Sequence, residues 1–532
     1  MRSLLRTRVA AIVLLAIGAA TVLGLRRRRP RRPPTLGAGP APRAPGTGGA
    51  LTGSPPAAPP EPGLAPPEPG LAPPEPGLTP SESGLAPSAE PAAAAAAVPA
   101  RGRRRPRRRT AVIAAAALVV LVAGGAAVGY ALYVRSSGGD VVGSSTVEFV
   151  APAPPAATTA PLPPAAVPAR PALPPVVWPT YGFDNRRLRS VPSALRPPFR
   201  RVWSFRGRNL IEFPPTLAYG RLTLAVNHGE VFSIDARTGK AVWSYPSGRC
   251  VAASPAVADR VVYASFMNRP PCNSTASAVD GEVVAFDALT GRIRWRASMG
   301  VTESSPLVAN GLVYVGDWRG QVLALDAATG STRWSFQTGG KVKGAAALAD
   351  GRLVIGSYDS HVYALDARTG ALLWKASTQE RIGSSGTFYA TPALAFGRVY
   401  IGATDGKVYS FGASTGKLRW SQSTGGYVYA SAAVWRRLVL VGSYSGTFFA
   451  FDAATGEERW RFRAGGPISG SAVVIGDIVY VSTLKERTYA LDAATGKLLW
   501  SFPDGKYGAA IADAGRLYLV GYTRLYAMVP AR

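Results

Sequence analysis

One stretch decides the fold of this chain: Val322-Leu323-Ala324-Leu325-Asp326-Ala327-Ala328-Thr329-Gly330-Ser331-Thr332-Arg333-Trp334. An alternating apolar run, a turn rich in Asp, Thr and Gly, and a run that ends in an aromatic residue predict two strands joined by a hairpin. Just upstream, residues 311–316 are another alternating run and residues 305–308 a short apolar one. The sequence around Trp334 therefore predicts four short strands in a row.

The tryptophan that ends this stretch recurs through the chain. Eight tryptophans are separated by 40, 52, 39, 40, 46, 40 and 40 residues, namely Trp203, Trp243, Trp295, Trp334, Trp374, Trp420, Trp460 and Trp500. A period of about 40 residues is the length of one four-stranded propeller blade. We therefore predict an all-β propeller in which each Trp wedges against the neighbouring sheet.

The turn before each Trp also recurs, with Asp at its start and Gly at its end. Further copies begin at Asp235, Asp287, Asp366, Asp452 and Asp492, whereas Gly412 replaces the Asp in one copy. An Asp accepts hydrogen bonds from turn amides, and a Gly adopts positive φ without strain. We expect these aspartates to be structural and not catalytic.

The two ends of the array complement each other. Runs at 509–512, 515–521 and 524–528 supply three strands without a final Trp strand, and residues 201–205 are a Trp strand without a blade before it. Joining them completes eight blades and closes the ring, which removes an exposed sheet edge. The sequence predicts an eight-bladed β-propeller over residues 178–532.

The repeat Val/Leu-Tyr/Val-Ala-Leu-Asp-Ala-x-Thr-Gly-x-x-x-Trp and the opening Trp178-Pro179-Thr180-Tyr181-Gly182-Phe183-Asp184 resemble the pyrroloquinoline-quinone (PQQ) type of eight-bladed propeller. That family includes quinoprotein alcohol dehydrogenases and the outer-membrane assembly scaffold BamB. The resemblance covers residues 178 to 528 and implies the fold. It leaves open an enzyme or a scaffold.

The N-terminal third carries two apolar stretches, Val9 to Leu25 and Ala111 to Val134, and each has an arginine cluster on the side that faces the other. Arginine-rich flanks stay cytoplasmic, so we expect a two-helix membrane hairpin with the propeller outside the cytoplasm. A cleavable signal sequence at Val9 to Leu25 is the competing interpretation. The expected domains are an apolar helix at 1–25, an Arg/Pro-rich disordered segment at 26–109, a transmembrane helix at 110–134, a Pro/Ala-rich linker at 135–177, and the propeller.

The net charge of the chain is +29. A basic surface outside the cytoplasm favours anionic surroundings such as lipid headgroups or acidic wall polymers, and this compartment argues against nucleic acid as a partner. The same compartment permits a disulfide between the two cysteines, Cys250 and Cys272, which strand reversal places at one end of the same blade.

Insertions point to one face of the propeller. The interval from inner strand to blade Trp is 28 residues in most repeats but 40 in the cysteine-containing one, and a second insertion precedes the inner strand near residue 392. Both emerge on the face where inner strands begin, and loops on a rigid scaffold are where binding usually resides. The candidate binding face comprises Glu212, Arg249, Glu303, Lys341, Lys343, Glu380, Arg381, Tyr389, Tyr427, Tyr429 and Lys506.

Catalysis finds little support in the sequence. Quinoprotein dehydrogenases carry a vicinal Cys-Cys pair, acidic and Asn calcium ligands and a catalytic Asp, and no Cys-Cys pair occurs here. His228 and His361 both fall in expected hairpins, without a catalytic or metal-binding cluster around them. We predict no catalytic residue, no metal and no cofactor; a PQQ and calcium titration tests this.

The sequence thus favours a non-catalytic binding or scaffold module for protein or cell-envelope partners, and it leaves a small-molecule ligand open. The alternatives are a PQQ-dependent oxidoreductase and a sensor that signals through the Pro-rich cytoplasmic loop. Deletion of residues 33–100 distinguishes a scaffold from a sensor, since a scaffold should still work without this segment and a sensor should lose its signal.

Overall fold

A computed structural model of the chain describes residues 124–125, 139–151, 174–272, 280–379 and 386–531. The chain divides into two units, Met1–Gly102 and Arg103–Arg532, and the first lies outside the described residues. The expected segments 1–25 and 26–109 also lie outside them, as does all of the expected helix 110–134 except residues 124 and 125. Within the described residues, no helix has the length and apolar character needed to cross a bilayer.

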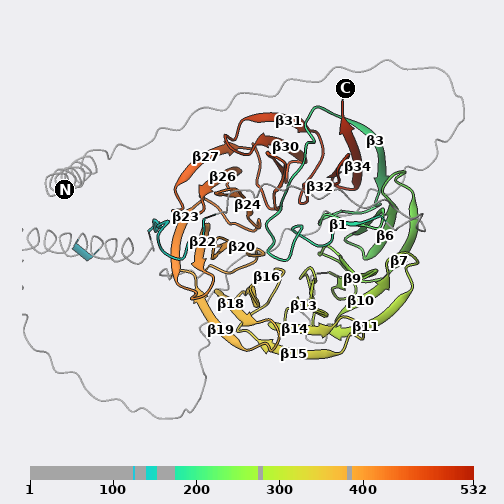
Figure 1. Ribbon diagram of the computed structural model, residues 1–532, viewed down its shortest axis with the longest axis horizontal. Coiled ribbons are helices and arrows are strands. Elements are labelled where there is room, and N and C mark those ends of the chain that lie inside the picture. Colours follow the sequence, from blue (N-terminus) through green and yellow to red (C-terminus); the bar gives the residue numbers. More distant parts are fainter. Residues whose placement is uncertain (1–123, 126–138, 152–173, 273–279, 380–385, 532) are drawn as a thin grey trace, which may run out of the picture. The chain divides into compact units, whose positions relative to one another are not determined.

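Eight antiparallel sheets stand around one axis, as the sequence predicts (Figure 1). In the first seven blades the chain runs from the axis outward through four consecutive strands. Blades one to four consist of β4 (Thr216–Ala218), β5 (Arg221–Ala225), β6 (Glu230–Asp235) and β7 (Ala241–Pro246); β8 (Ala256–Ala258), β9 (Val261–Phe266), β10 (Gly281–Asp287) and β11 (Ile293–Met299); β12 (Leu307–Ala309), β13 (Leu312–Gly316), β14 (Gln321–Asp326) and β15 (Thr332–Gln337); and β16 (Ala347–Ala349), β17 (Arg352–Gly356), β18 (His361–Asp366) and β19 (Leu372–Ser377).

The remaining blades follow the same order. They consist of β20 (Ala393–Ala395), β21 (Arg398–Gly402), β22 (Lys407–Gly412) and β23 (Leu418–Ser423); β24 (Ala433–Trp435), β25 (Leu438–Gly442), β26 (Thr447–Asp452) and β27 (Glu458–Arg463); β28 (Val473–Ile475), β29 (Ile478–Thr483), β30 (Arg487–Asp492) and β31 (Leu498–Phe502); and β32 (Ala510–Ala512), β33 (Leu517–Val520), β34 (Arg524–Pro530) and β3 (Phe199–Arg206).

Blade eight joins the two ends of the propeller. Strand β3, from the start of the array, pairs antiparallel with β34 at its end, from Phe199 opposite Pro530 to Arg206 opposite Arg524. The predicted closure of the ring by the N-terminal Trp strand is therefore confirmed, and β34 is not left as an edge strand.

Seven of the eight blades are each fixed to the next by the Trp and Gly of the repeat; blade seven, with Trp500, is the exception. The indole Nε1 of Trp295 donates to the Ala327 carbonyl in the next blade at 3.0 Å, and a Cβ atom placed on Gly330 would lie 2.5 Å from its ring. A glycine there is needed both for this close approach and for its positive φ of 77°. The same contact joins Trp203 to Gly239, Trp243 to Gly291, Trp334 to Gly370, Trp374 to Gly416, Trp420 to Gly456 and Trp460 to Gly496.

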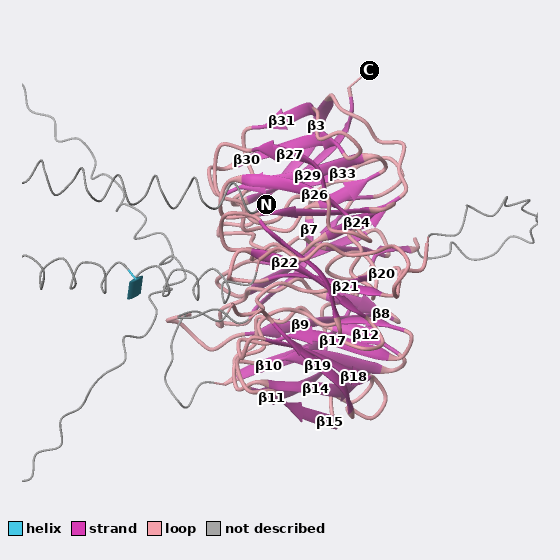
Figure 2. Cartoon of the chain, turned by 90° about the vertical axis from the view of Figure 1, so that its left-hand side faces the viewer, coloured by secondary structure: helices cyan, strands magenta, loops and turns pink. Residues whose placement is uncertain are grey.

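The core lies between neighbouring sheets. Val354 and Val362 of blade four, for example, are fully buried in one cluster with Ile401 and Tyr409 of blade five. The side view in Figure 2 shows the strands in the middle of the ring, with loops on its two faces. We call the face at which the inner strands begin the loop face.

A segment that the sequence analysis did not place in a blade closes the ring axis on the other side. Strand β1 (Val176–Trp178) pairs with β4 of blade one, and β2 (Ser190–Val191) pairs in parallel with β28 of blade seven. Between these strands the segment accepts backbone hydrogen bonds from four further inner strands, in the pairs Val257 to Pro179, Leu348 to Asn185, Leu394 to Arg186 and Val434 to Leu188. Residues 176–191 therefore form a floor across the axis, which is coloured teal in Figure 1.

Part of the expected linker also contacts the propeller. Val141 exchanges two backbone hydrogen bonds with Ser421 of β23, and Gly143 N donates to Thr455 O at 2.8 Å. Arg398 donates from its guanidinium to the carbonyls of Ser144, Val147 and Glu148. Residues 139–151 thus lie against blades five and six.

Candidate functional site

A cavity of about 60 Å³ lies on the ring axis, above the floor and open to the loop face. Trp178, Tyr181, Gly182 and Arg189 of the floor line its base. Residues from the loops that enter the inner strands line its wall, among them Glu212, Phe213, Glu303, Ser305, Lys343, Tyr389, Thr391, Tyr429, Ser431 and Ser471. The inner strands begin with small residues, which leaves this space free near the axis.

The structure brings five of the predicted face residues to this cavity: Glu212, Glu303, Lys343, Tyr389 and Tyr429. Lys343 Nζ lies 3.1 Å from Glu303 Oε1, and the Tyr389 hydroxyl donates to Glu303 Oε2 at 3.4 Å. The Glu303 side chain is 8% exposed, so this ion pair is well shielded from water. Its carboxylate is therefore held in place by two named donors.

The second carboxylate, Glu212, is in a different electrostatic state. Burial, and then the nearby charge of Glu303, raise its pKa to about 7, although a hydrogen bond from Asn227 and the charge of Lys343 oppose this shift. Burial disfavours the ionised form of a carboxyl group. The charge of the cavity therefore changes near neutral pH.

Aromatic side chains continue from the cavity across the loop face. The ring of Tyr389 packs edge-on against Tyr429 at 5.3 Å, and Tyr429 packs against Tyr444 at 5.2 Å. Tyr427, which is 45% exposed, contacts Tyr429 and Tyr444. At the other end Tyr358 contacts Tyr389, and Lys343 lies over the rings of Tyr358 and Trp318.

We call this set the aromatic arc; it consists of Trp318, Tyr358, Tyr389, Tyr427, Tyr429 and Tyr444. Lys341, another predicted face residue, lies 4.5 Å from the centre of the Trp318 ring. The sequence analysis missed Trp318, Tyr358 and Tyr444. Each follows by two positions the glycine that ends a second strand, at Gly316, Gly356 and Gly442, and this recurring Gly-x-aromatic pattern is the signal that could have identified them.

The other predicted face residues lie apart from the cavity. Arg249 pairs with Asp280 at 2.8 Å and with Glu282 at 3.1 Å beside the insertion of blade two. Cys250 and Cys272 form the predicted disulfide, with 5.4 Å between their Cα atoms. Lys506 lies over the Tyr522 ring at 4.5 Å. Glu380 and Arg381 fall outside the described residues.

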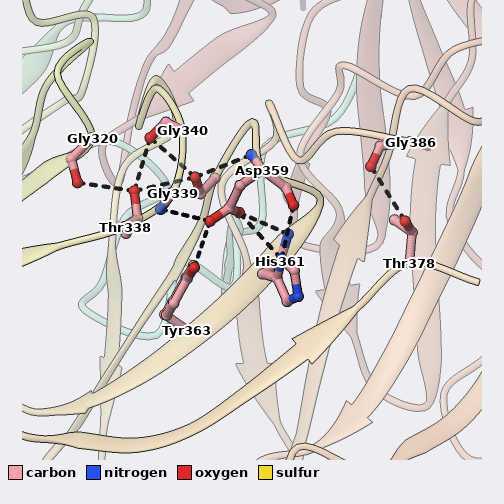
Figure 3. A network of polar contacts seen from close by, with 10 residues as sticks. Gly320, Thr338, Gly339, Gly340, Asp359, His361, Tyr363, Thr378 and Gly386 are labelled. Carbon is pink, nitrogen blue, oxygen red and sulfur yellow. Dashed lines mark hydrogen bonds and ion pairs between the residues drawn. The ribbon is translucent and has the colours of Figure 1, made fainter.

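His361 belongs to a network that fixes a hairpin of blade four (Figure 3). The Asp359 carboxylate accepts hydrogen bonds from Gly339 N at 2.7 Å and from the Tyr363 hydroxyl at 2.5 Å, and His361 Nδ1 lies 2.8 Å from the Asp359 carbonyl oxygen. Burial opposes ionisation of Asp359, but these donors lower its pKa below the usual range. The network connects the Asp359 hairpin to the loop that follows β15.

The side chains that could act as metal ligands at the axis do not fit calcium-bound PQQ. Two carboxylates line the cavity. Glu303 is paired with Lys343, and Glu212 is only partly ionised near neutral pH. Among the described residues, no three His, Cys, Asp or Glu side chains are grouped so that they could hold a metal ion. The volume of about 60 Å³ is also well below the ~300–1,000 Å³ usual for ligand pockets.

The sequence of the second half of the chain places this propeller among known proteins. The family of the outer membrane protein assembly factor BamB matches residues 279–431 and 423–529. The domain is a PQQ-like propeller of the BamB type. No curated protein sequence matches the chain.

Solved structures with the same architecture include both scaffolds and enzymes. BamB from Moraxella catarrhalis is 20% identical, covers 62% of this chain and 100% of its own, and has a TM-score of 0.51. The quinohemoprotein alcohol dehydrogenase from Comamonas testosteroni is 16% identical, covers 67% of this chain and 81% of its own, and scores 0.57. A europium-containing methanol dehydrogenase is 14% identical; the match covers 67% of this chain and 98% of the dehydrogenase, with a TM-score of 0.57. At these identities the BamB-type propeller shares the fold with each of them, and the fold alone does not assign an activity.

Proposed function

We propose that this BamB-type propeller is a membrane-anchored, extracytoplasmic module that binds a protein or cell-envelope partner at its loop face and catalyses no reaction. The aromatic arc carries the proposal. Tyr and Trp are enriched at protein interfaces, where each provides a large contact area together with a polar group. An arc of six such residues beside Lys341 and Lys343 has that composition.

The arc is preorganised for binding. Tyr429 is 7% exposed and holds the exposed Tyr427 through ring contact, so part of the arc is anchored in the domain while part meets solvent. Anchored side chains lose little conformational freedom on association, which favours affinity. The two lysines add positive charge, so we expect an acidic partner surface.

The contacts of residues 139–151 bear on how the loop face is turned relative to the membrane. Lys407 Nζ and Gln379 Nε2 donate to the Gly139 carbonyl at 3.1 and 3.3 Å. Lys407 begins β22 and Gln379 follows β19, so both lie on the loop-face side of the ring. Gly139 follows the expected helix 110–134 by five residues, which extend over at most about 18 Å. We infer that the loop face turns toward the bilayer.

Site-specific photo-crosslinking in cells tests the binding face. A photoreactive residue at position 427 replaces a 45% exposed Tyr, and a matched one at position 242 replaces a 43% exposed Val on the outer strand of blade one. We expect a discrete adduct from position 427 that weakens when Lys341→Glu is added, and none from position 242. Equal labelling from both positions, or none from 427, would count against the loop face.

A separate measurement addresses catalysis. The full-length chain is titrated with PQQ and calcium and assayed for dye-linked alcohol oxidation. We expect no turnover; saturable binding with turnover would overturn the non-catalytic assignment whatever the crosslinking shows.

A further inference from the structure

A buried arginine at the base of the axial cavity has two nitrogen atoms without a partner. Arg189 is 1% exposed, and its Nη1 donates to the Arg187 carbonyl at 2.8 Å. Within the described part of the chain its Nε and Nη2 have no hydrogen-bond partner of good geometry, although the Tyr181 hydroxyl lies near enough for the charge of Arg189 to favour its ionised form. A buried charged group that leaves a hydrogen bond unmade destabilises the fold, so such atoms normally have a partner.

The guanidinium is closely packed, and its Nε and Nη2 edge is the part that lacks a hydrogen bond. Its central carbon lies 4.5 Å from the centre of the Tyr181 ring. A Cβ added to Gly182 would lie 3.3 Å from the same carbon, so the backbone also packs closely against the guanidinium. The Nε and Nη2 hydrogens lie on one edge and point in parallel, which is the arrangement that a carboxylate accepts with its two oxygens.

A second buried arginine makes the base of the cavity more positive. Arg187 is completely buried and donates to the carbonyls of Ala346, Tyr181 and Pro306 and to the Thr180 hydroxyl, all of them neutral. The nearby Asp184 carboxylate accepts from the Leu188 amide instead, at 3.0 Å. Buried charges are ordinarily compensated by an opposite charge. No carboxylate is hydrogen-bonded to either arginine among the described residues.

Hydroxyl groups around the wall add further donors. Thr391 Oγ1 accepts from Ala345 N, Ser431 Oγ from Thr391 N, and Ser471 Oγ from Ser431 N, at 2.8 to 3.0 Å. A hydroxyl that accepts one hydrogen bond can still donate its own proton, but the Ser471 hydroxyl also hydrogen-bonds to the Tyr181 hydroxyl at 2.8 Å. The lower part of the cavity is therefore rich in donors, and this composition suits an anion.

We propose that the axial cavity binds a small organic monocarboxylate, with its two oxygens on the Nε and Nη2 edge of Arg189. The volume of about 60 Å³ admits a molecule of a few non-hydrogen atoms. Phe213, Tyr389 and Tyr429 provide an apolar and aromatic wall for its remaining part, and Glu212 and Glu303 near the wall disfavour a polyanion. This site is independent of the proposed partner binding at the loop face.

Thermal unfolding of the full-length chain tests the site. A ligand that binds the folded state raises its stability in proportion to RT ln(1 + [L]/Kd), so acetate and propionate should raise Tm saturably at constant ionic strength, whereas chloride should not. Acetamide is the matched neutral probe, because it has the shape of acetate without its charge. A Tm rise with acetamide equal to that with acetate, or no rise with either carboxylate beyond chloride, overturns the proposal.

Variants then locate the binding. Arg189→Lys keeps the positive charge and loses the bidentate edge, so we expect the Kd for acetate to rise at least tenfold. Arg196→Lys, at a side chain that is 62% exposed and pairs with Asp477, is the control and should leave the Kd unchanged. An unchanged Kd in Arg189→Lys overturns the assignment. Should that variant not fold, the comparison of acetate with acetamide on the unaltered chain still decides.

Discussion

The carboxylate of Glu148 takes, beside Gly412, the place that an aspartate holds in the turns of the other blades. It accepts hydrogen bonds from Ser414 Oγ at 3.1 Å, from Thr415 Oγ1 at 3.0 Å and from Arg419 Nε at 2.7 Å. A Cβ on Gly412 would lie 1.8 Å from Glu148 Oε2, so a side chain there and this carboxylate exclude each other. Residue 412 starts the one repeated turn in which Gly replaces Asp.

The ordinary turns show what is being replaced. Asp326 accepts from the Thr329 amide and hydroxyl and from the Arg333 guanidinium, seven residues on. Arg419 lies seven residues after Gly412 in the same way. The missing aspartate thus leaves a cationic turn that a carboxylate from residues 139–151 fills, and this contact fastens that segment to blade five.

Glu148→Gln should loosen the segment without unfolding the propeller. The substitution removes the charge from hydrogen bonds that are only partly shielded from solvent, which we expect to cost on the order of 1 kcal/mol. Hydrogen exchange of the Val141, Gly143 and Val150 amides, all bonded to the blades, should accelerate. Glu457→Gln removes an exposed partner of Arg459 and is the control. Unchanged exchange in Glu148→Gln would show that the backbone contacts alone hold the segment.

Gly412→Asp should release the same segment by supplying the turn with its own carboxylate. The stability of the propeller should stay level or rise, while amide exchange in 139–151 accelerates. Gly412→Ala displaces Glu148 without replacing its charge, so its Tm should fall below that of Gly412→Asp. If the two variants have equal Tm values, the carboxylate does not stabilise the turn.

The Trp and Gly contact between blades can be separated from the strain of positive φ. Gly330 and Gly311 have φ values of 77° and 73°, but a Cβ on Gly330 meets the Trp295 ring whereas one on Gly311 has open space around it. Gly311→Ala should cost about 1 kcal/mol from backbone strain alone. Gly330→Ala should cost roughly 1–3 kcal/mol more, as overpacking does. Chemical denaturation of both variants measures the difference; similar losses would deny the packing role of the glycine.

Period and turn chemistry were sufficient to predict the propeller from the sequence. A Trp about every 40 residues and an Asp-to-Gly turn before it recur along the chain, and the orphan strand at 201–205 matched the vacancy after Arg524–Pro530. These signals are local and repeated. Because the same residues recur at the same positions in successive repeats, a single altered copy, such as the turn that starts with Gly412, is easy to recognise.

The contacts made once in the chain were not predictable in this way. The floor at 176–191 has no alternation, and its bonds reach inner strands as distant as Val434 and Val474. Glu148 lies 271 positions from Arg419, so nothing near Gly412 in the sequence identifies the residue that compensates it. The residues of the candidate binding face were predicted because short loops between repeats are recognisable in the sequence. The surroundings of Arg189 depend instead on how the floor crosses the axis, which the sequence does not show.

Glu212 makes stability depend on pH in a direction that the sequence does not suggest. Its folded-state pKa is raised to about 7, so the folded protein binds a proton there that the unfolded chain has already lost above pH ~4.5. This contribution is fully present below pH ~4.5 and is lost as pH rises toward and through 7. Glu212→Gln removes the ionisation, and the variant should therefore gain stability relative to the parent chain as pH rises from 5 to 8, on the order of 2 kcal/mol. Chemical denaturation of both chains at each pH measures the gap. Glu230→Gln, at the partly exposed start of β6, controls for the loss of a carboxylate. A gap for Glu212→Gln that stays constant with pH would mean that Glu212 is already ionised at pH 5.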